Sequence, residues 1–116
     1  MRRTLATLCW LSVITLICPL EMASAQDAAA IKKGQEVYAA QKCSVCHAIA
    51  GKGGKSSPLD GVGAKLSAAD IREWIVHPIE MAKKTKSEKK PPMPGKYGAL
   101  PAPELDALVA YMQSLK

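Results

Sequence analysis

The chain has 116 residues, a formal net charge of +6 and no phenylalanine. This length suits one domain and excludes an arrangement of several. The scarcity of large apolar side chains also excludes a large core made by the chain alone. What remains possible is a small helical domain with an Ala, Leu and Val core, or one in which a bound group completes the core.

The N-terminal segment has the pattern of a secretory signal peptide. Two arginines precede an apolar run over residues 5–20, and the sequence Ala-Ser-Ala at 23–25 has the small residues of a signal peptidase site. We therefore predict a signal peptide over residues 1–25, a mature domain over 26–116 and export to a bacterial periplasm. A retained N-terminal anchor is the alternative. Cleavage would remove two of the four cysteines, which leaves no disulfide framework.

The first predicted helix of the mature domain covers residues 28–42. Ile31, Gly34, Val37 and Tyr38 recur at helical spacing and share one face. This helix leads directly into the next motif.

A Cys-x-x-Cys-His motif follows at Cys43, Cys46 and His47. One helical turn brings both sulfurs to one side, and the adjacent imidazole projects toward a metal between them. The motif predicts covalent attachment of one haem c through both thiols, with His47 as an axial ligand of the iron. Two other kinds of site use the same residue types. A thioredoxin-like redox pair would need a βαβ frame. A zinc site would need further ligands, and His77 is the one other histidine on offer.

The next segment is a loop followed by a helix. Residues 50–63 contain five glycines and one proline, too many breakers for regular structure. Ser67 and Asp70 form a capping-box pattern that begins a helix, and Pro78 ends it. The apolar stripe of this helix consists of Ile71, Trp74 and Ile75.

The C-terminal part of the chain is a second loop followed by a final helix. Residues 83–101 are polar and rich in proline, and Pro103 stands at a first-turn position. The final helix is amphipathic, because its apolar residues recur at helical spacing. They are Leu105, Leu108, Val109, Met112 and Leu115. No internal repeat and no hairpin signal interrupts this helical pattern.

These segments resemble the class I c-type cytochromes, over nearly the whole mature chain. The matching segments are residues 34–38, 43–47, 57–63, 74–78, 91–94 and 108–112. The resemblance implies an all-α cytochrome c fold, in which three to four main helices surround one covalently bound haem and the first and last helices cross. It also implies that Gly34 lets the two backbones approach and that Tyr111 packs beside the crossing.

Met93 is the candidate for the sixth iron ligand. It lies in a Pro-Pro-Met-Pro run at 91–94, where the prolines hold an extended backbone that can present one side chain across a haem face. The resemblance places the axial methionine there as well. Met112 is expected in the core of the last helix. The alternatives are His77 and Met81. Met81 is expected after a helix end, facing the lysine-rich loop.

The resemblance implies further contacts around the haem. The carbonyl of Pro58 should accept the second ring N–H of His47. Trp74 should lie near the propionates, where its indole N–H can donate to a carboxylate oxygen. Leu59 and Tyr97 are also expected to contact the haem.

Positive charge gathers in the loop that leads to Met93. Without the signal peptide the chain has 14 basic and 9 acidic side chains, a net charge of +5. The residues expected to dock partners are Lys83, Lys84, Lys86, Lys89, Lys90 and, beside the haem motif, Lys42. We expect a monomer that meets acidic redox proteins: another cytochrome, a multihaem cytochrome, an oxidase or a dehydrogenase. Nucleic acid is not an expected partner, nor is stable membrane insertion once the signal is cleaved.

Three functions fit these residues. The preferred one is a periplasmic one-electron carrier that is not an enzyme and has no catalytic residue, with His47 and Met93 as axial ligands. The second is a cytochrome subunit held tightly by a periplasmic dehydrogenase or other oxidoreductase. The third is a haem enzyme or gas sensor with an open sixth position, for which His77 is the one distal candidate.

Overall fold

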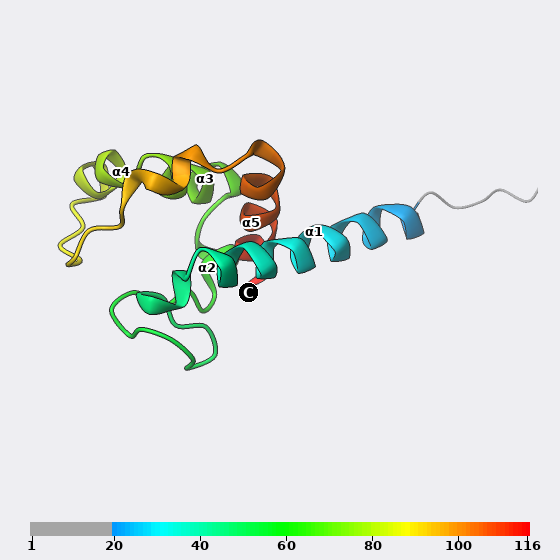
Figure 1. Ribbon diagram of the computed structural model, residues 1–116, viewed down its shortest axis with the longest axis horizontal. Coiled ribbons are helices and arrows are strands. Elements are labelled where there is room, and N and C mark those ends of the chain that lie inside the picture. The colour runs from blue at the N-terminus through cyan, green and yellow to red at the C-terminus, as the bar shows by residue number, and fades with distance from the viewer. Residues whose placement is uncertain (1–19) are drawn as a thin grey trace, which may run out of the picture.

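The computed structural model describes residues 20–116, which form five α-helices, two short 3-10 helices and no β-strand (Figure 1). The all-α class predicted from the sequence is therefore confirmed. Most of the predicted signal peptide lies outside the described residues. Within residues 20–116, no helix combines the length and the apolar character that a membrane span requires.

The first helix, α1, spans Leu20–Ala40. It thus begins before the predicted residue 28 and ends before the predicted residue 42. Its end is set by Lys42, whose φ of 55° places the backbone in the left-handed region, which an α-helix cannot continue through. In Figure 1 the N-terminal end of α1 extends beyond the rest of the helices.

The last helix, α5, spans Ala102–Ser114 and packs across α1. A Cβ atom built on Gly34 would lie 2.1 Å from the carbonyl oxygen of Ala107 and 2.6 Å from the Cβ atom of Tyr111. Only glycine allows this approach. The ring of Tyr111 meets that of Tyr38 edge to face, with centroids 5.8 Å apart. The predicted crossing and the predicted roles of Gly34 and Tyr111 in it are confirmed.

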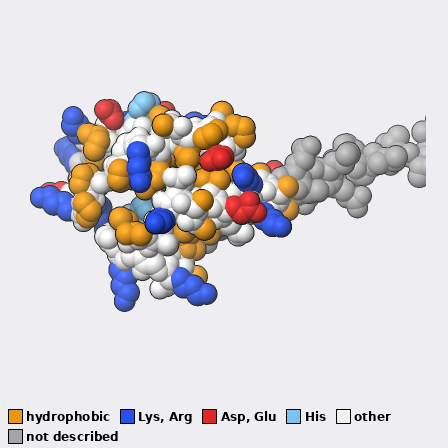
Figure 2. Space-filling view, viewed as in Figure 1, with side chains coloured by type: hydrophobic (Ala, Val, Ile, Leu, Met, Phe, Trp, Pro, Cys, Tyr) orange, Lys and Arg blue, Asp and Glu red, His pale blue; other side chains and the backbone are white. Residues whose placement is uncertain are grey.

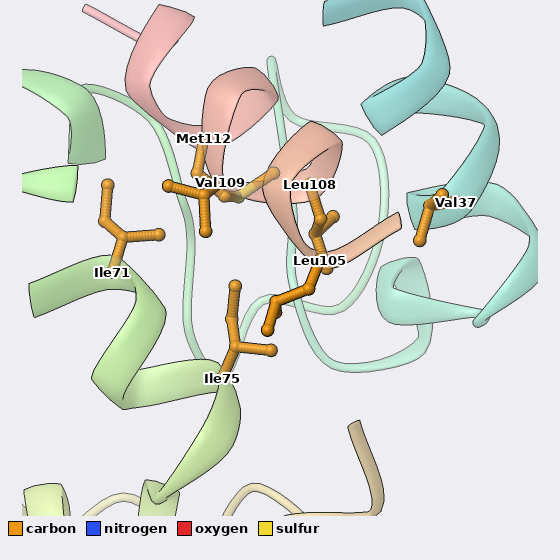
Figure 3. Close-up of a cluster of buried hydrophobic side chains, with 7 residues drawn as sticks. All are labelled: Val37, Ile71, Ile75, Leu105, Leu108, Val109 and Met112. Carbon is orange, nitrogen blue, oxygen red and sulfur yellow. The ribbon is translucent and has the colours of Figure 1, made fainter. Parts of the chain in front are cut away.

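One cluster of apolar side chains forms the core, between α5, α3 and α1 (Figure 3). Helix α5 contributes most of it, and the stripe predicted for this helix is buried except at its last residue, which is partly exposed. Each member of the cluster keeps between 3% and 8% of its surface exposed. The members are Val37, Ile71, Ile75, Leu105, Leu108, Val109 and Met112. The core is thus thin, as expected from a chain without phenylalanine.

Helix α3 spans Ala68–Val76 and begins with the predicted capping box. The backbone N–H of Asp70 donates to Ser67 Oγ at 3.1 Å, and the backbone N–H of Ser67 donates to Asp70 Oδ2 at 3.4 Å. The hydroxyl and the backbone N–H of Ser67 both hold the pKa of Asp70 below its ordinary value of 3.8. Ile71 and Ile75 are buried, so the face of this helix that carries the apolar stripe is turned toward the core, as predicted.

Helix α4, Pro78–Thr85, corrects two expectations. Pro78 does end α3, but it also begins α4, because its fixed φ and missing N–H suit a first helical position. Met81 therefore lies within a helix and is buried, at 7% exposure, rather than facing the lysine-rich loop. The helix ends at Lys86, where φ is 52°.

Two short elements complete the fold. Helix α2 spans Val62–Lys65, at the end of the segment predicted to be a loop, and the 3-10 helix η2 spans Gly95–Ala99. The N–H of Gly63 donates to the carbonyl of Leu115 at 2.8 Å, and a Cβ on Gly63 would lie 2.2 Å from the carbonyl oxygen of Gln113. This glycine therefore lets the loop pack against the C-terminal end of α5.

Candidate functional site

The cysteine and histidine motif forms a tight turn directly after α1. Its first three residues are the 3-10 helix η1, Cys43–Val45. The backbone N–H groups of Cys46 and His47 both donate to the carbonyl of Cys43, at 3.2 and 3.0 Å. The two cysteines and the histidine therefore share one turn of backbone, as the motif predicts.

No disulfide joins the two cysteines of this turn. Cys43 is half-buried and Cys46 is exposed. Burial raises the pKa of the Cys43 thiol, and the neighbouring Cys46 adds to that effect, while a backbone hydrogen bond and Lys96 oppose it. Neither sulfur is committed to a disulfide, so both are available to form thioethers.

The ring of His47 has a defined hydrogen-bond partner. Its Nδ1 lies 2.7 Å from the carbonyl oxygen of Ser57. Because a carbonyl can only accept, Nδ1 donates in this bond, and Nε2 is the ring nitrogen that remains to bind a metal. The expectation that Pro58 supplies this carbonyl is wrong by one residue. Pro58 is exposed, and the backbone fixed by its ring presents the carbonyl of Ser57 instead.

The loop after the motif folds back over it. The N–H of Gly54 donates to the carbonyl of Ser44 at 2.8 Å, and a Cβ on Gly54 would lie 2.2 Å from the carbonyl oxygen of Val45. Gly53 has φ of 114°, and its Cβ would lie 2.4 Å from the carbonyl oxygen of His47. These two glycines therefore let the loop backbone rest on the turn, and this brings residue 57 to the His47 ring.

Tyr38 also touches His47, which the sequence did not indicate. Its hydroxyl donates to the backbone carbonyl of His47 at 2.7 Å. Burial raises the pKa of Tyr38 to about 12, with smaller contributions from Cys43 and Tyr111. The phenol is therefore a neutral donor at physiological pH.

The candidates for the sixth ligand lie in three different settings. Met93 follows α4 in an extended segment, is partly buried and packs against the core cluster. Met81 is buried within α4. His77 is exposed at the junction of α3 and α4. Of the two methionines among these candidates, Met81 lies in a helix and Met93 lies in a non-helical segment, as the prolines around Met93 predict.

The other predicted haem contacts lie in the loop before α2, on η2 and on α3. Leu59 and Tyr97 are partly buried and pack against the core cluster. The pKa of Tyr97 is raised, first by burial and then by the charges that Cys43 and Cys46 can carry. Trp74 is half-buried on α3, and its indole has no hydrogen-bond partner among the described residues. Its contact with a propionate stays a prediction.

The predicted docking lysines are all exposed. They lie on α4, at its end and in the loop that follows, with Lys42 beside the motif. Figure 2 shows basic side chains gathered at the end of the molecule where Figure 1 places α4 and this loop. Lys83 and Lys86 also line a shallow groove of about 490 Å³ together with Ile79, which is 41% exposed.

The residues of the turn fit covalently bound haem. Two free thiols one turn apart can bond the two vinyl groups, and Nε2 of His47 can bind the iron. In residues 20–116, no three Cys, His, Asp or Glu side chains converge on one point as ligands of a zinc ion would. A thioredoxin-like frame is not found either, because this part of the chain has no strand. Fold and site together define a small helical haem protein.

Comparison with protein families agrees with this class. The family model described as Cytochrome c matches residues 31–116, so the chain belongs to the cytochrome c family. Comparisons with curated proteins and with solved structures find no match. Membership of the family means that the protein carries covalently bound haem c, and the positions of Cys43 and Cys46 fit such a site; members of this family are typically electron carriers.

Proposed function

We propose that the protein is a one-electron carrier of the bacterial periplasm whose haem iron is bound by His47 and Met93. The bound haem supplies a centre that gains or loses one electron. The observation that carries the proposal is the hydrogen bond from Nδ1 of the His47 ring to the Ser57 carbonyl, because it leaves Nε2 as the nitrogen that can bind iron beside Cys43 and Cys46.

The protein side chains have distinct tasks in this proposal. The Ser57 carbonyl orients the His47 ring and strengthens it as a donor to the metal. Met93 offers a neutral thioether from a partly buried position, and a methionine ligand raises the reduction potential. Both ligands stay in place when the charge of the centre changes, which favours electron transfer with little rearrangement.

Replacing Met93 by leucine tests the ligand assignment. The change removes the sulfur and keeps the apolar volume. We expect the oxidised, haem-loaded protein to show the weak long-wavelength band of sulfur-to-iron charge transfer, and Met93→Leu to lose it. Met81→Leu and Met112→Leu are the controls, because both methionines are buried in helices and should leave the band unchanged. A band that persists in Met93→Leu, or that wild type never shows, would refute Met93 ligation and favour Met81, His77 or an open site.

We further propose that acidic redox proteins dock on the lysine cluster of α4 and its following loop, defined as Lys83, Lys84, Lys86, Lys89 and Lys90. All five are exposed, and they lie on α4, at its C-terminal end and in the segment that leads to Met93. Opposite charge on a partner would speed encounter in a salt-dependent way.

A permanently bound subunit is the second candidate function. The exposed side chain of Ile79 and the groove beside it favour this possibility, because an apolar groove can bury against a lasting partner. Size measurement of the protein purified from its own cell at native abundance distinguishes the two. A carrier elutes alone at the mass of one chain, and a subunit elutes with a second protein.

Export and processing are tested by an intact mass. We expect the purified protein to have lost residues 1–25 and gained one haem. The mass of the complete chain plus haem would instead indicate a retained anchor. Either mass shows whether the haem is attached covalently, since a non-covalent haem dissociates on denaturation.

A further inference from the structure

Tyr38 connects the crossing of α1 and α5 to the histidine of the haem motif. Its ring packs edge to face on Tyr111, at an interplanar angle of 81°. One turn earlier on α1, Gly34 holds the backbone against the carbonyl of Ala107. The position of the Tyr38 side chain is therefore set by the helix crossing, and its hydroxyl reaches the carbonyl of His47 at 2.7 Å.

His47 is held by three hydrogen bonds of different origin. Its backbone N–H donates to Cys43 within the turn, and its ring donates to Ser57 in the loop. The bond from Tyr38 to its carbonyl is the one that comes from the packed helices. Rotation of the His47 peptide would break this bond and shift the Cα–Cβ direction from which the ring projects. The ring itself is fixed at Nδ1, so such a rotation would tilt its plane.

We propose that Tyr38 is a positioning residue for the His47 ligand. Its hydroxyl bonds the His47 carbonyl to the packed α1–α5 crossing and so restricts the orientation of the imidazole. The inference rests on the proposed iron ligation by His47. It assigns the hydroxyl a task beyond filling space, since a phenylalanine at position 38 would supply the same ring without the bond.

The test compares Tyr38→Phe with Tyr111→Phe in the haem-loaded protein. Each variant loses one hydroxyl and keeps the edge-to-face ring pair. Tyr111 is the matched control, because no hydrogen bond from its hydroxyl is found in the part of the chain that the structure describes. Proton NMR of the oxidised protein reports on His47, through the paramagnetic shifts of its ring protons and the exchange rate of its Nδ1–H with solvent.

We expect Tyr38→Phe to move the His47 ring shifts and to speed Nδ1–H exchange about fivefold, the factor that corresponds to one hydrogen bond of ordinary net strength. Tyr111→Phe should change neither. Equal changes in both variants would overturn the inference in favour of simple packing, and so would no change in either.

Two further observations keep the inference falsifiable. If wild type shows no paramagnetically shifted His47 ring protons, the proposed ligation itself fails and this inference fails with it. If Tyr38→Phe does not yield haem-loaded protein, the inference is tested instead by proton exchange in the reduced wild-type protein. Its Tyr38 hydroxyl proton should exchange slowly with solvent, and fast exchange would overturn the inference.

Discussion

Gly34 is the residue at which a single methyl group should matter most. A Cβ there would lie 2.1 Å from a backbone oxygen of α5, which cannot move aside without separating the helices. We expect Gly34→Ala to lower the free energy of unfolding of the loaded protein by about 1–3 kcal/mol, the usual cost of overpacking. Denaturant unfolding measures it.

Gly95→Ala is the matched control for this change. Apart from Gly95 itself, its two chain neighbours and the backbone of its own short helix, no residue has an atom within 4 Å of a Cβ built there. The same added methyl should therefore alter the free energy of unfolding by less than about 0.5 kcal/mol. Similar losses in both variants would show that general loss of glycine, and not the helix contact, sets the cost.

At His47, the sequence predicts the side-chain ligand but not the residues that hydrogen-bond to it. The motif itself identifies the ligand, because thiols and imidazole are side-chain chemistry. The acceptor of the ring N–H is a backbone carbonyl, which every residue has, so its assignment depends on the path of the loop. The sequence placed it at Pro58, whereas the structure has it at Ser57. The Tyr38 bond is likewise invisible in sequence, since tyrosine on a helix face equally indicates packing.

At the scale of elements, the capping box of α3 makes stability depend on pH. The pKa of Asp70 is held below 3.8 by Ser67, so the ionised carboxylate stabilises the folded state. This contribution is fully present above the unfolded pKa and is lost as the pH falls through the lower folded pKa. We expect Asp70→Asn to be less stable than wild type at neutral pH, and the difference to vanish in acid. Thermal unfolding against pH measures it.

Glu73→Gln and Ser67→Ala complete this experiment. Glu73 is an exposed carboxylate of the same helix, outside the capping box, so its replacement should not reproduce the pH dependence. Ser67→Ala removes the cap acceptor and should cost about 1 kcal/mol. A pH profile of Asp70→Asn that stays parallel to wild type would contradict the role of the carboxylate.

Elements defined by local signals were predicted, and those defined by context were not. The capping box of α3 and the apolar stripe of α5 are set by neighbouring residues, so both appear in the sequence. Helix α4 was missed because proline ends one helix and begins the next with the same chemistry. Helix α2 was missed because its glycine-rich segment becomes helical only where Gly63 packs on α5.

The whole molecule should depend on haem for its folded state. The core cluster consists of six aliphatic side chains and one methionine with no aromatic ring among them, and none of the seven is completely enclosed. Domains of this size have little stability to spare. We expect the chain with Cys43→Ser and Cys46→Ser, purified without haem, to lose much of the helical circular dichroism of the loaded protein and to unfold without a cooperative transition. Cooperative unfolding with full helix content would contradict this.

For the whole molecule, the rate of electron transfer to the haem should depend on where the positive charge lies and not only on the net charge. Small charged redox reagents probe it without a protein partner. Lys89→Gln with Lys90→Gln lowers the charge next to the Met93 segment. Lys32→Gln with Lys65→Gln makes the same change in net charge from exposed positions on α1 and α2.

At low ionic strength, where charges act over about 30 Å, reduction by an anionic complex such as ferrocyanide should slow several-fold in the first pair and less in the second. Reduction by a cationic complex such as hexaammineruthenium(II) should change in the opposite direction, because the same local charge repels it. Both differences should disappear near 1 M salt, where screening shortens the range to about 3 Å. Equal slowing in both pairs would mean that net charge alone guides the reagents, and that the lysine cluster is an ordinary solvated loop.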